Sequence, residues 1–451
     1  MPSARASTAG HTAAGPGAGG QDVAGARPAD DDDGAGGAVP VLRTADEATA
    51  AARAYAESIA DGVIERDRAG ASAPPVAELA ALDASGLLAI TVPRAAGGPE
   101  LGATVLAEVV RTIAAVDPSI AQVPQGHFLF VDALAVWGSP EQQQRLFGEV
   151  LRGARLGNAQ AERGGLHAQD LKTRLRGFPG AGTGAFGPGA GAGPSWPRLH
   201  GRKYYTTGSL TARWIGVTAL DDSNTLVLAF VRRDASGVHV DDDWNVMGQR
   251  ATVSGSATFD DVPVDPGLVV PYARAFEVPQ QLGARSQLVH AAIQAGIARG
   301  ALNDAGAFVR TKARPFFEAA RAGWAHAASE DPHTIYRYGE LATKVSAAEA
   351  LLASAAATLD EVGRVPAGEK EAGRGSLAVA QAKAFASDVA AEVAGDLFSL
   401  SGASATDEKY DLSRHWRNAR THASHDPVAW KYHHVGNFLL NDVLPPNHGQ
   451  L

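Results

Sequence analysis

The stretch Leu341–Leu359, LATKVSAAEALLASAAATL, decides the fold expected for this chain. Its leucines, valine and buried-type alanines recur at three- and four-residue spacing, which places them on one face of a helix. A similar stripe runs from Leu377 to Leu400, and Gly402 is placed to end that helix. Long helices with such stripes are typical of an antiparallel bundle. Residues 276–451 are therefore predicted to form a four-helix bundle and a tail.

A second kind of stripe precedes it. Ala292, Gly296 and Gly300 repeat every four residues, so another helix can approach closely along this face. The tail from Trp430 to Leu451 is aromatic and apolar and needs a surface to pack against. Together these features predict a homotetramer.

Three further segments precede the bundle. Residues 1–40 are rich in Ala, Gly, Asp and Pro, which predicts a disordered tail, and they lack the pattern of a secretory signal. Residues 41–156 show helical periodicity and form a predicted α-helical domain, with single helices over Val105–Val116 and Ile120–Trp137. His127 interrupts the second of these apolar helices, where a core histidine is the more frequent case.

Residues 157–275 change in composition. Short runs rich in Val, Thr, Tyr and Ile, such as Trp214–Leu220 and Ser256–Val262, predict a small central β domain, a β-barrel. The Gly/Pro-rich segment 177–197 is predicted to be a mobile loop between two strands. The whole chain is thus expected to be mainly α with a central β domain.

Composition excludes several classes of protein. Of 451 residues, 40 are Lys or Arg and 49 are Asp or Glu, so a net charge of −9 argues against a nucleic-acid partner. The absence of cysteine excludes disulfides, thiolate catalysis and cysteine-ligated metals. No apolar run approaches the roughly 18 residues of a membrane helix. These features fit a cytoplasmic protein that does not bind membranes.

Polar chemistry gathers in residues 417–427, RNARTHASHDP. His422 and His425 are three apart and share a face on a helix. Pro427 disfavours helical geometry at the residue before it, so the helix should end near His425. The negative end of the helix dipole there favours protonated imidazole.

Three interpretations of this stretch stay open on spacing alone. It is a polar helix end at a subunit contact, an acid/base site, or a metal site built on His422, His425 and the pair His433 and His434. The last lacks an evident third ligand.

Several stretches, in this order, resemble the acyl-CoA dehydrogenase superfamily, and most closely its flavin-dependent monooxygenase branch, which includes dibenzothiophene monooxygenases and SfnB-type sulfur-acquisition oxidoreductases. The resemblance spans residues 45–448. It rests on the stretches Gly157–Glu162, Gly201–Gly208, Asp242–Trp244, Met247–Arg250, Gln294–Ala298, Arg310–Pro315, Glu330–Pro332 and Arg414–Asn441.

The resemblance implies a flavin between the β domain and the bundle. Asn158, Thr207 and Trp244 would line its isoalloxazine, and Arg310 would reach its phosphate, often across a subunit boundary. Each also has an ordinary interpretation, as a strand or core residue or a solvated arginine. The dibenzothiophene enzyme has serine at Thr207 and an arginine where this chain has Ser404.

The resemblance also implies a catalytic set. His425 would lie beside the flavin and handle the proton that oxygen transfer to sulfur requires. His127 and Thr207 would complete the pocket. The expected activity is a two-component monooxygenase that uses reduced FMN from a separate flavin reductase, or FAD, with O2 and a small organosulfur substrate.

The principal alternative is an acyl-CoA dehydrogenase. Counting from Arg417, the catalytic glutamate of that family falls on Asp426. Aspartate is shorter by one methylene and is followed by Pro427 rather than glycine, which puts it out of reach of a substrate proton. A metal-dependent hydrolase and a non-enzymatic scaffold are the remaining alternatives.

Overall fold

The structure is a computed structural model that describes residues 39–165, 170–178 and 196–446. These residues belong to one compact unit. The predicted tail, 1–40, and the predicted loop, 177–197, lie almost entirely outside the described residues. The boundaries predicted between the three ordered segments stay predictions.

The first segment is helical, as its periodicity predicts. Thr44 forms a capping box with Glu47 that starts the first helix. Asp117 accepts hydrogen bonds from two backbone amides and starts the fifth. The helices are α1 (Ala45–Ile59), α2 (Val63–Ala69), α3 (Val76–Ala84), α4 (Ala103–Ala114), α5 (Pro118–Gln122), α6 (Gln125–Trp137) and α7 (Pro140–Leu151).

The helix predicted over Ile120–Trp137 is in fact two helices. α5 ends at Gln122, and α6 begins after Pro124. Proline has no amide hydrogen to continue the first helix, and its fixed φ suits a helix start. The break places Gln122 and His127 on different elements.

The central segment is one mixed sheet, with strand order β6-β7-β3-β2-β4-β5-β8 and β1 paired with β4. β1 and β2 run parallel to β4, and the other pairs are antiparallel. The strands are β1 (Leu156–Ala159), β2 (Arg174–Arg176), β3 (Arg198–Tyr204), β4 (Trp214–Leu220), β5 (Leu226–Arg232), β6 (Val238–Val240), β7 (Ser256–Pro263) and β8 (Val269–Val270).

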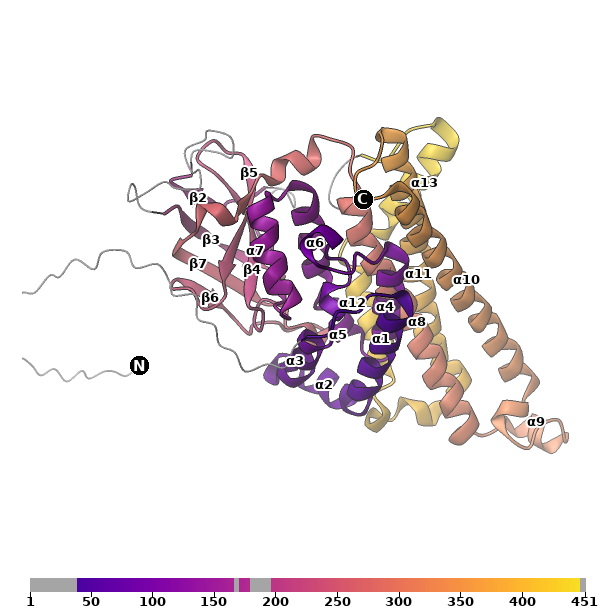
Figure 1. Ribbon diagram of the computed structural model, residues 1–451. Helices are drawn as coiled ribbons and strands as arrows, with labels where there is room; N and C mark the ends of the chain where they lie inside the picture. Colours follow the sequence, from indigo (N-terminus) through magenta and orange to yellow (C-terminus); the bar gives the residue numbers. More distant parts are fainter. Residues whose placement is uncertain (1–38, 166–169, 179–195, 447–451) are drawn as a thin grey trace, which may run out of the picture. The chain divides into compact units, whose positions relative to one another are not determined.

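The last segment is built on three long helices that run side by side, α8, α10 and α11 (Figure 1). The predicted apolar stripe is buried throughout, from Leu341 to Leu359. Gly402 ends α11 with a φ of 75°, as predicted. The helices are α8 (Leu282–Thr311), α9 (Phe317–Arg321), α10 (Pro332–Val362), α11 (Glu369–Ser401), α12 (Ser413–Ala423) and α13 (Val428–Asn441).

The small-residue stripe on α8 meets a helix of the same chain. A Cβ atom at Gly296 would lie 2.5 Å from the Ala114 Cβ, and one at Gly300 would lie 2.4 Å from the Ala115 carbonyl oxygen. The close approach that we predicted is therefore made by α4. The stripe no longer supports a homotetramer, because no second subunit is needed to cover it.

None of the described helices is both long and apolar enough to cross a membrane.

Candidate active site

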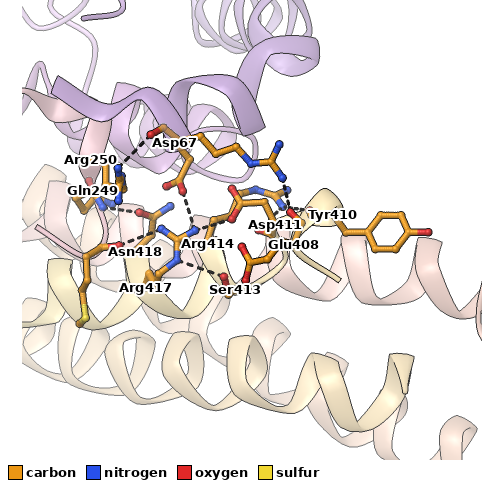
Figure 2. Close-up of polar contacts among 12 residues, drawn as sticks. Asp67, Gln249, Arg250, Glu408, Tyr410, Asp411, Ser413, Arg414, Arg417 and Asn418 are labelled. Carbon is orange, nitrogen blue, oxygen red and sulfur yellow. Dashed lines mark hydrogen bonds and ion pairs between the residues drawn. The ribbon is translucent and has the colours of Figure 1, made fainter. Parts of the chain in front are cut away.

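α12 is the element on which the site is built, because it contacts all three segments. Figure 2 shows Arg417 of this helix between two carboxylates. Its guanidinium donates to Asp67 of α2 and to Asp411, each at 2.7 Å, and to the backbone oxygen of Met247 at 3.0 Å. Burial and the nearby Asp67 carboxylate raise the pKa of Asp411, and Arg417 opposes them. Arg417 thus fixes α12 to α2 and to a loop of the β domain.

That loop touches the helix backbone. A Cβ atom at Gly248 would lie 2.0 Å from the Arg417 carbonyl oxygen, so only glycine allows this approach. The next residue, Gln249, has a φ of 54°, and its amide donates to the Asn418 side chain, as Figure 2 shows. The Gln249 side chain is 3% exposed, and neither end of its amide has a partner among the described residues.

Three of the predicted flavin-binding residues lie together beside this loop. Asn158 Nδ2 donates to the Tyr205 backbone oxygen at 3.1 Å. The Asn158 backbone N–H donates to the Thr207 backbone oxygen, also at 3.1 Å. The Trp244 ring packs edge-on against Tyr205, with centroids 6.1 Å apart. Trp244 Nε1 donates to the Gln249 backbone oxygen at 2.9 Å. We call Asn158, Thr207, Trp244 and Gln249 the β-domain cluster.

The Thr207 hydroxyl belongs to a chain of buried hydroxyl groups. It lies 2.7 Å from the Ser254 hydroxyl, which donates to Thr252 at 2.8 Å. Thr252 donates to the Gln249 backbone oxygen at 2.9 Å. The chain ties the predicted residue Thr207 to the loop that packs on α12.

One turn beyond Asn418, α12 enters a group of three histidines. His422 Nε2 lies 3.1 Å from His290 Nδ1 of α8 and 3.1 Å from Gln122 Oε1 of α5. The His425 ring stacks on His290, with centroids 4.1 Å apart and planes tilted by 36°. A helical turn rises about 5.4 Å, so this group lies close to the β-domain cluster.

Burial sets the charge of this group. It lowers the pKa of both His290 and His422 well below the ordinary value, and the nearby charges of His425 and Lys383 lower it further. The expectation that the helix dipole favours protonation was wrong for His422, because loss of solvation outweighs the dipole in a fully buried site. His290 and His422 are therefore neutral near pH 7.

His425 differs from its neighbours in exposure. α12 ends at Ala423, two residues before the end that we had expected. His425 therefore lies in the turn before Pro427 and not on the helix. Its side chain is 45% exposed. The two histidines of the motif still reach one place, because both contact His290.

Asp426 is paired and not free. Its carboxylate is bound by Lys383 of α11 and, at 2.8 Å, by Lys431 of α13. Burial would raise the pKa of Asp426, but the His425 ring 3.7 Å away and the two lysines hold it far below its usual range. A carboxylate held in this way is a poor base.

The two remaining predicted residues lie elsewhere. His127 is fully buried, with Nε2 at 2.8 Å from the Leu88 oxygen and Nδ1 accepting from the Leu156 amide at 3.2 Å. Both ring nitrogens are occupied, and within the described residues His127 makes no hydrogen bond or ring contact with His425. Arg310 is exposed, 20 residues beyond His290 on α8, which is about 30 Å along the helix.

Metal binding finds no support in this geometry. Within the residues that the structure describes, no three His, Asp or Glu side chains are arranged to hold a metal ion.

Comparison with known proteins places this arrangement in a family. Residues 44–154 match the acyl-CoA dehydrogenase N-terminal domain, and residues 288–430 match the acyl-CoA dehydrogenase C-terminal domain. A probable FMNH2-dependent monooxygenase, SfnC of Pseudomonas putida, is 33% identical over 90% of this chain and 98% of its own length. The chain belongs to the acyl-CoA dehydrogenase superfamily, in its FMNH2-dependent monooxygenase branch.

Solved structures of this branch share the fold. FMN-bound TdsC, a dibenzothiophene monooxygenase from Paenibacillus sp. A11-2, superposes with a TM-score of 0.81 at 30% identity, covering 90% of this chain and 100% of its own. Methanesulfinate monooxygenase MsuC from Pseudomonas fluorescens gives a TM-score of 0.77 at 31% identity, covering 89% and 99%. The resemblance drawn from the sequence motifs is confirmed.

Four residues of this monooxygenase-branch site were missed by sequence reasoning, namely Gln122, Gln249, His290 and Lys383. A signal existed for His290, which is a polar residue inside the apolar run of α8 and four residues before Gln294. Two buried polar positions at helical spacing indicate a polar face inside a core.

Proposed function

We propose that the protein is the oxygenase component of a two-component system that oxygenates a small organosulfur compound for sulfur acquisition, with reduced FMN supplied by a separate flavin reductase. One observation carries this proposal. The half-exposed His425 stacks on a neutral, buried histidine, His290. His290 contacts His422, which lies one turn of α12 beyond the residue that binds the β-domain cluster. The activities of the relatives SfnC, TdsC and MsuC, as their names give them, support it.

The residues present fit FMN. Gln249 offers a buried primary amide with both ends unpartnered. Such an amide complements the carbonyl and N–H groups along the edge of an isoalloxazine. Asn158, Thr207 and Trp244 would hold the ring beside it. When bound, reduced FMN supplies the two electrons that activate O2.

The histidine group supplies proton handling. Oxygenation adds one atom of O2 to sulfur and releases the other as water, so protons must be delivered at the reacting oxygen. His425 contacts solvent, and an imidazole gives and accepts protons near neutral pH. The His290 ring supports it from the inside, where a protonated imidazole would be costly. His425 is accordingly the proposed proton donor.

The dehydrogenase alternative is disfavoured by Asp426. A general base must reach its proton and be free to accept it. This carboxylate is bound by Lys383 and Lys431 and buried.

The test is His425→Ala, assayed with a flavin reductase, NADH and a panel of organosulfur compounds. We expect substrate oxygenation to fall by at least about a hundredfold, with reduced flavin spent on hydrogen peroxide and FMN affinity retained. His433→Ala, an exposed histidine on α13, is the matched control and should behave as the unaltered protein.

Near-normal oxygenation by His425→Ala would show that this histidine is structural. Loss of folding and flavin together would show the same. Rapid NADH oxidation by the pure protein, without reductase, would contradict the two-component assignment.

A further inference from the structure

The turn between α12 and α13, residues 424–427, carries His425 and Asp426 side by side. Pro427 begins the next helix with its fixed φ, and the His425 backbone N–H donates to the His422 oxygen at 3.1 Å. The backbone of the turn is therefore held at both ends. The Asp426 side chain is 4% exposed and that of His425 is 45% exposed, so the two meet where the packed helices give way to solvent.

Three nitrogen atoms surround the Asp426 carboxylate. Its Oδ1 is bound by Lys383 of α11, and the same oxygen lies 3.7 Å from His425 Nδ1. Its Oδ2 lies 2.8 Å from Lys431 Nζ of α13. Lys383 is bound in turn by Gln287 Oε1 of α8. Through these partners the carboxylate is fixed to three helices, and it cannot follow the imidazole if that ring turns away.

Stacking alone does not fix the orientation of the His425 ring. The His290 ring lies against it with centroids 4.1 Å apart, which restricts its plane. Half a turn of the ring about its bond to the chain keeps that plane but exchanges Nδ1 with a carbon atom. A hydrogen-bonding group beside the ring distinguishes the two orientations, and Asp426 Oδ1 lies where it can do so.

A carboxylate in this place also selects a tautomer. An ionised carboxylate only accepts hydrogen bonds, so the ring nitrogen that faces it carries a hydrogen. With a hydrogen on Nδ1, Nε2 is the nitrogen of His425 that takes up and releases the second proton. The separation of 3.7 Å is longer than a hydrogen bond, and bonds of this kind often tighten only when the substrate complex forms.

The charges around the ring favour a role in orientation. Burial would raise the pKa of Asp426, but His425 and the two lysines hold it far below its usual range, so the carboxylate is ionised. Burial lowers the pKa of Lys383 to about 8, so that lysine is cationic near pH 7. The lysines offset the carboxylate charge, and what remains beside the ring is a directed acceptor. The titratable groups around His425 are Asp426 in the turn, Lys383 on α11, Lys431 on α13, and the neutral His290 on α8 and His422 on α12.

We propose that Asp426 is a positioning residue for the oxygenation, which holds the His425 ring with Nδ1 toward its carboxylate so that Nε2 delivers the proton. This inference rests on the proposed function, in which His425 is the proton donor. One proton leaves Nε2 for the reacting oxygen, Nδ1 keeps its hydrogen, and the half-exposed ring regains a proton from water. Asp426 stays ionised throughout, which is a different role from that of a base.

The test removes Asp426 without leaving Lys383 buried and unpaired. In Lys383→Met/Asp426→Leu, apolar side chains replace the ion pair, an exchange that proteins often tolerate. The substrate is whichever of methanesulfinate and dibenzothiophene the unaltered protein oxygenates faster with reductase and NADH. Relative to Lys383→Met alone, kcat should fall by about tenfold or more and peroxide should rise, while KM and FMN affinity change little. Lys383→Met/Asp426→Asn restores an acceptor oxygen and should recover part of the loss.

Solid-state 15N NMR reads the tautomer without flavin or turnover. In histidine-labelled, flavin-free full-length protein, the His425 signals are those missing from His425→Ala. When the ring is neutral, its hydrogen should lie on Nδ1 in Lys383→Met and move to Nε2 in Lys383→Met/Asp426→Leu. An ion pair that only joined α11 to α13 would not move this hydrogen.

Asp388→Asn in the same Lys383→Met background is the matched control. Asp388 is an exposed carboxylate of α11 that accepts from the Tyr432 hydroxyl of α13 at 2.6 Å, so it joins the same two helices. This variant should match Lys383→Met in kcat, in peroxide yield and in the NMR signals of His425.

Equal kcat and peroxide yield with and without Asp426 would overturn the inference, as would an unchanged tautomer. If the leucine variant does not fold, as judged by circular dichroism, the asparagine variant decides. Its kcat should still lie below that of Lys383→Met, because a neutral acceptor bonds more weakly than a carboxylate, and equality would overturn the inference. An Asp426-dependent tautomer in a protein that oxygenates neither compound would support the orientation of the ring and reject the proposed function alone.

Discussion

His127 shows what burial does to a single side chain in this protein. Both of its ring nitrogens bond to backbone groups, yet burial lowers its pKa from 6.5 to about 4. Hydrogen bonding to the Leu88 oxygen favours the charged form but does not outweigh the lost solvation. Its geometry supports a residue that holds α6 against the start of β1, and it leaves no nitrogen free for a substrate.

That shift predicts how stability depends on pH. Between pH 6.5 and 4 the unfolded chain binds a proton at residue 127 and the folded chain does not, so stability falls as pH falls. From pH 7.5 to 5 the His127 contribution is about 2 kcal/mol. His127→Gln lacks this titrating group. The difference in unfolding free energy between the unaltered protein and His127→Gln should therefore be about 2 kcal/mol smaller at pH 5 than at pH 7.5.

Urea unfolding at the two pH values measures this difference. The other buried histidines titrate equally in both proteins and cancel. Parallel stability curves for the two proteins would show that His127 titrates normally and is not buried in solution.

At the scale of elements, the contact between α12 and the loop at Gly248 determines the site. It holds the β-domain cluster one helical turn from the histidines, and it depends on the absence of a side chain. Gly248→Ala should cost about 1–3 kcal/mol of stability, because the backbone of one element must move. FMN affinity should fall as well, because Gln249 moves with the loop.

Gly339→Ala is the matched control. Nothing lies within 4 Å of a Cβ atom at this position inside α10, so alanine should stabilise the helix by roughly 0.5–1 kcal/mol. Thermal unfolding and flavin fluorescence titration of the two variants measure both effects. A Gly248→Ala protein as stable as Gly339→Ala, with normal FMN affinity, would mean that the loop does not press on α12.

At the scale of the whole molecule, the predicted homotetramer now depends on surfaces that the chain leaves exposed. Leu439 and Leu440 of α13 are 72% and 85% exposed, and Phe316 and Phe317 at the start of α9 are each 69% exposed. Large apolar side chains clustered at one element are typical of interfaces. Arg310 is too far along α8 to reach its own site, so a phosphate contact would have to serve another subunit.

This predicts that FMN affinity is lost when the predicted tetramer dissociates, and that it can also be lost without dissociation. Leu440→Asp should dissociate the tetramer, and Arg310→Ala should leave it assembled, while each weakens FMN by about tenfold or more. Light scattering and flavin fluorescence measure the two properties. A monomer that binds FMN as tightly as the unaltered protein would contradict both the oligomer and the role of Arg310.

The sequence alone determined features whose signal is local. The buried stripe from Leu341 to Leu359 follows from helical periodicity, and the end of α11 follows from the backbone freedom of Gly402. The span of β4 follows from its β-branched residues. Neighbouring residues in the sequence are enough to determine each of these features. The family followed from short motifs in their order. Asn158, Thr207 and Trp244 were proposed from motifs, and the fold brings them together.

The tertiary structure alone decided what those residues face. His290 and His422 are 132 residues apart, and no periodicity in the sequence predicts their contact. The sequence likewise did not predict that α4 packs on the small-residue stripe of α8, or that Lys383 pairs with Asp426. Charge was also decided at this level, because the loss of solvation that keeps His290 and His422 neutral exists only after all the packed elements have excluded water.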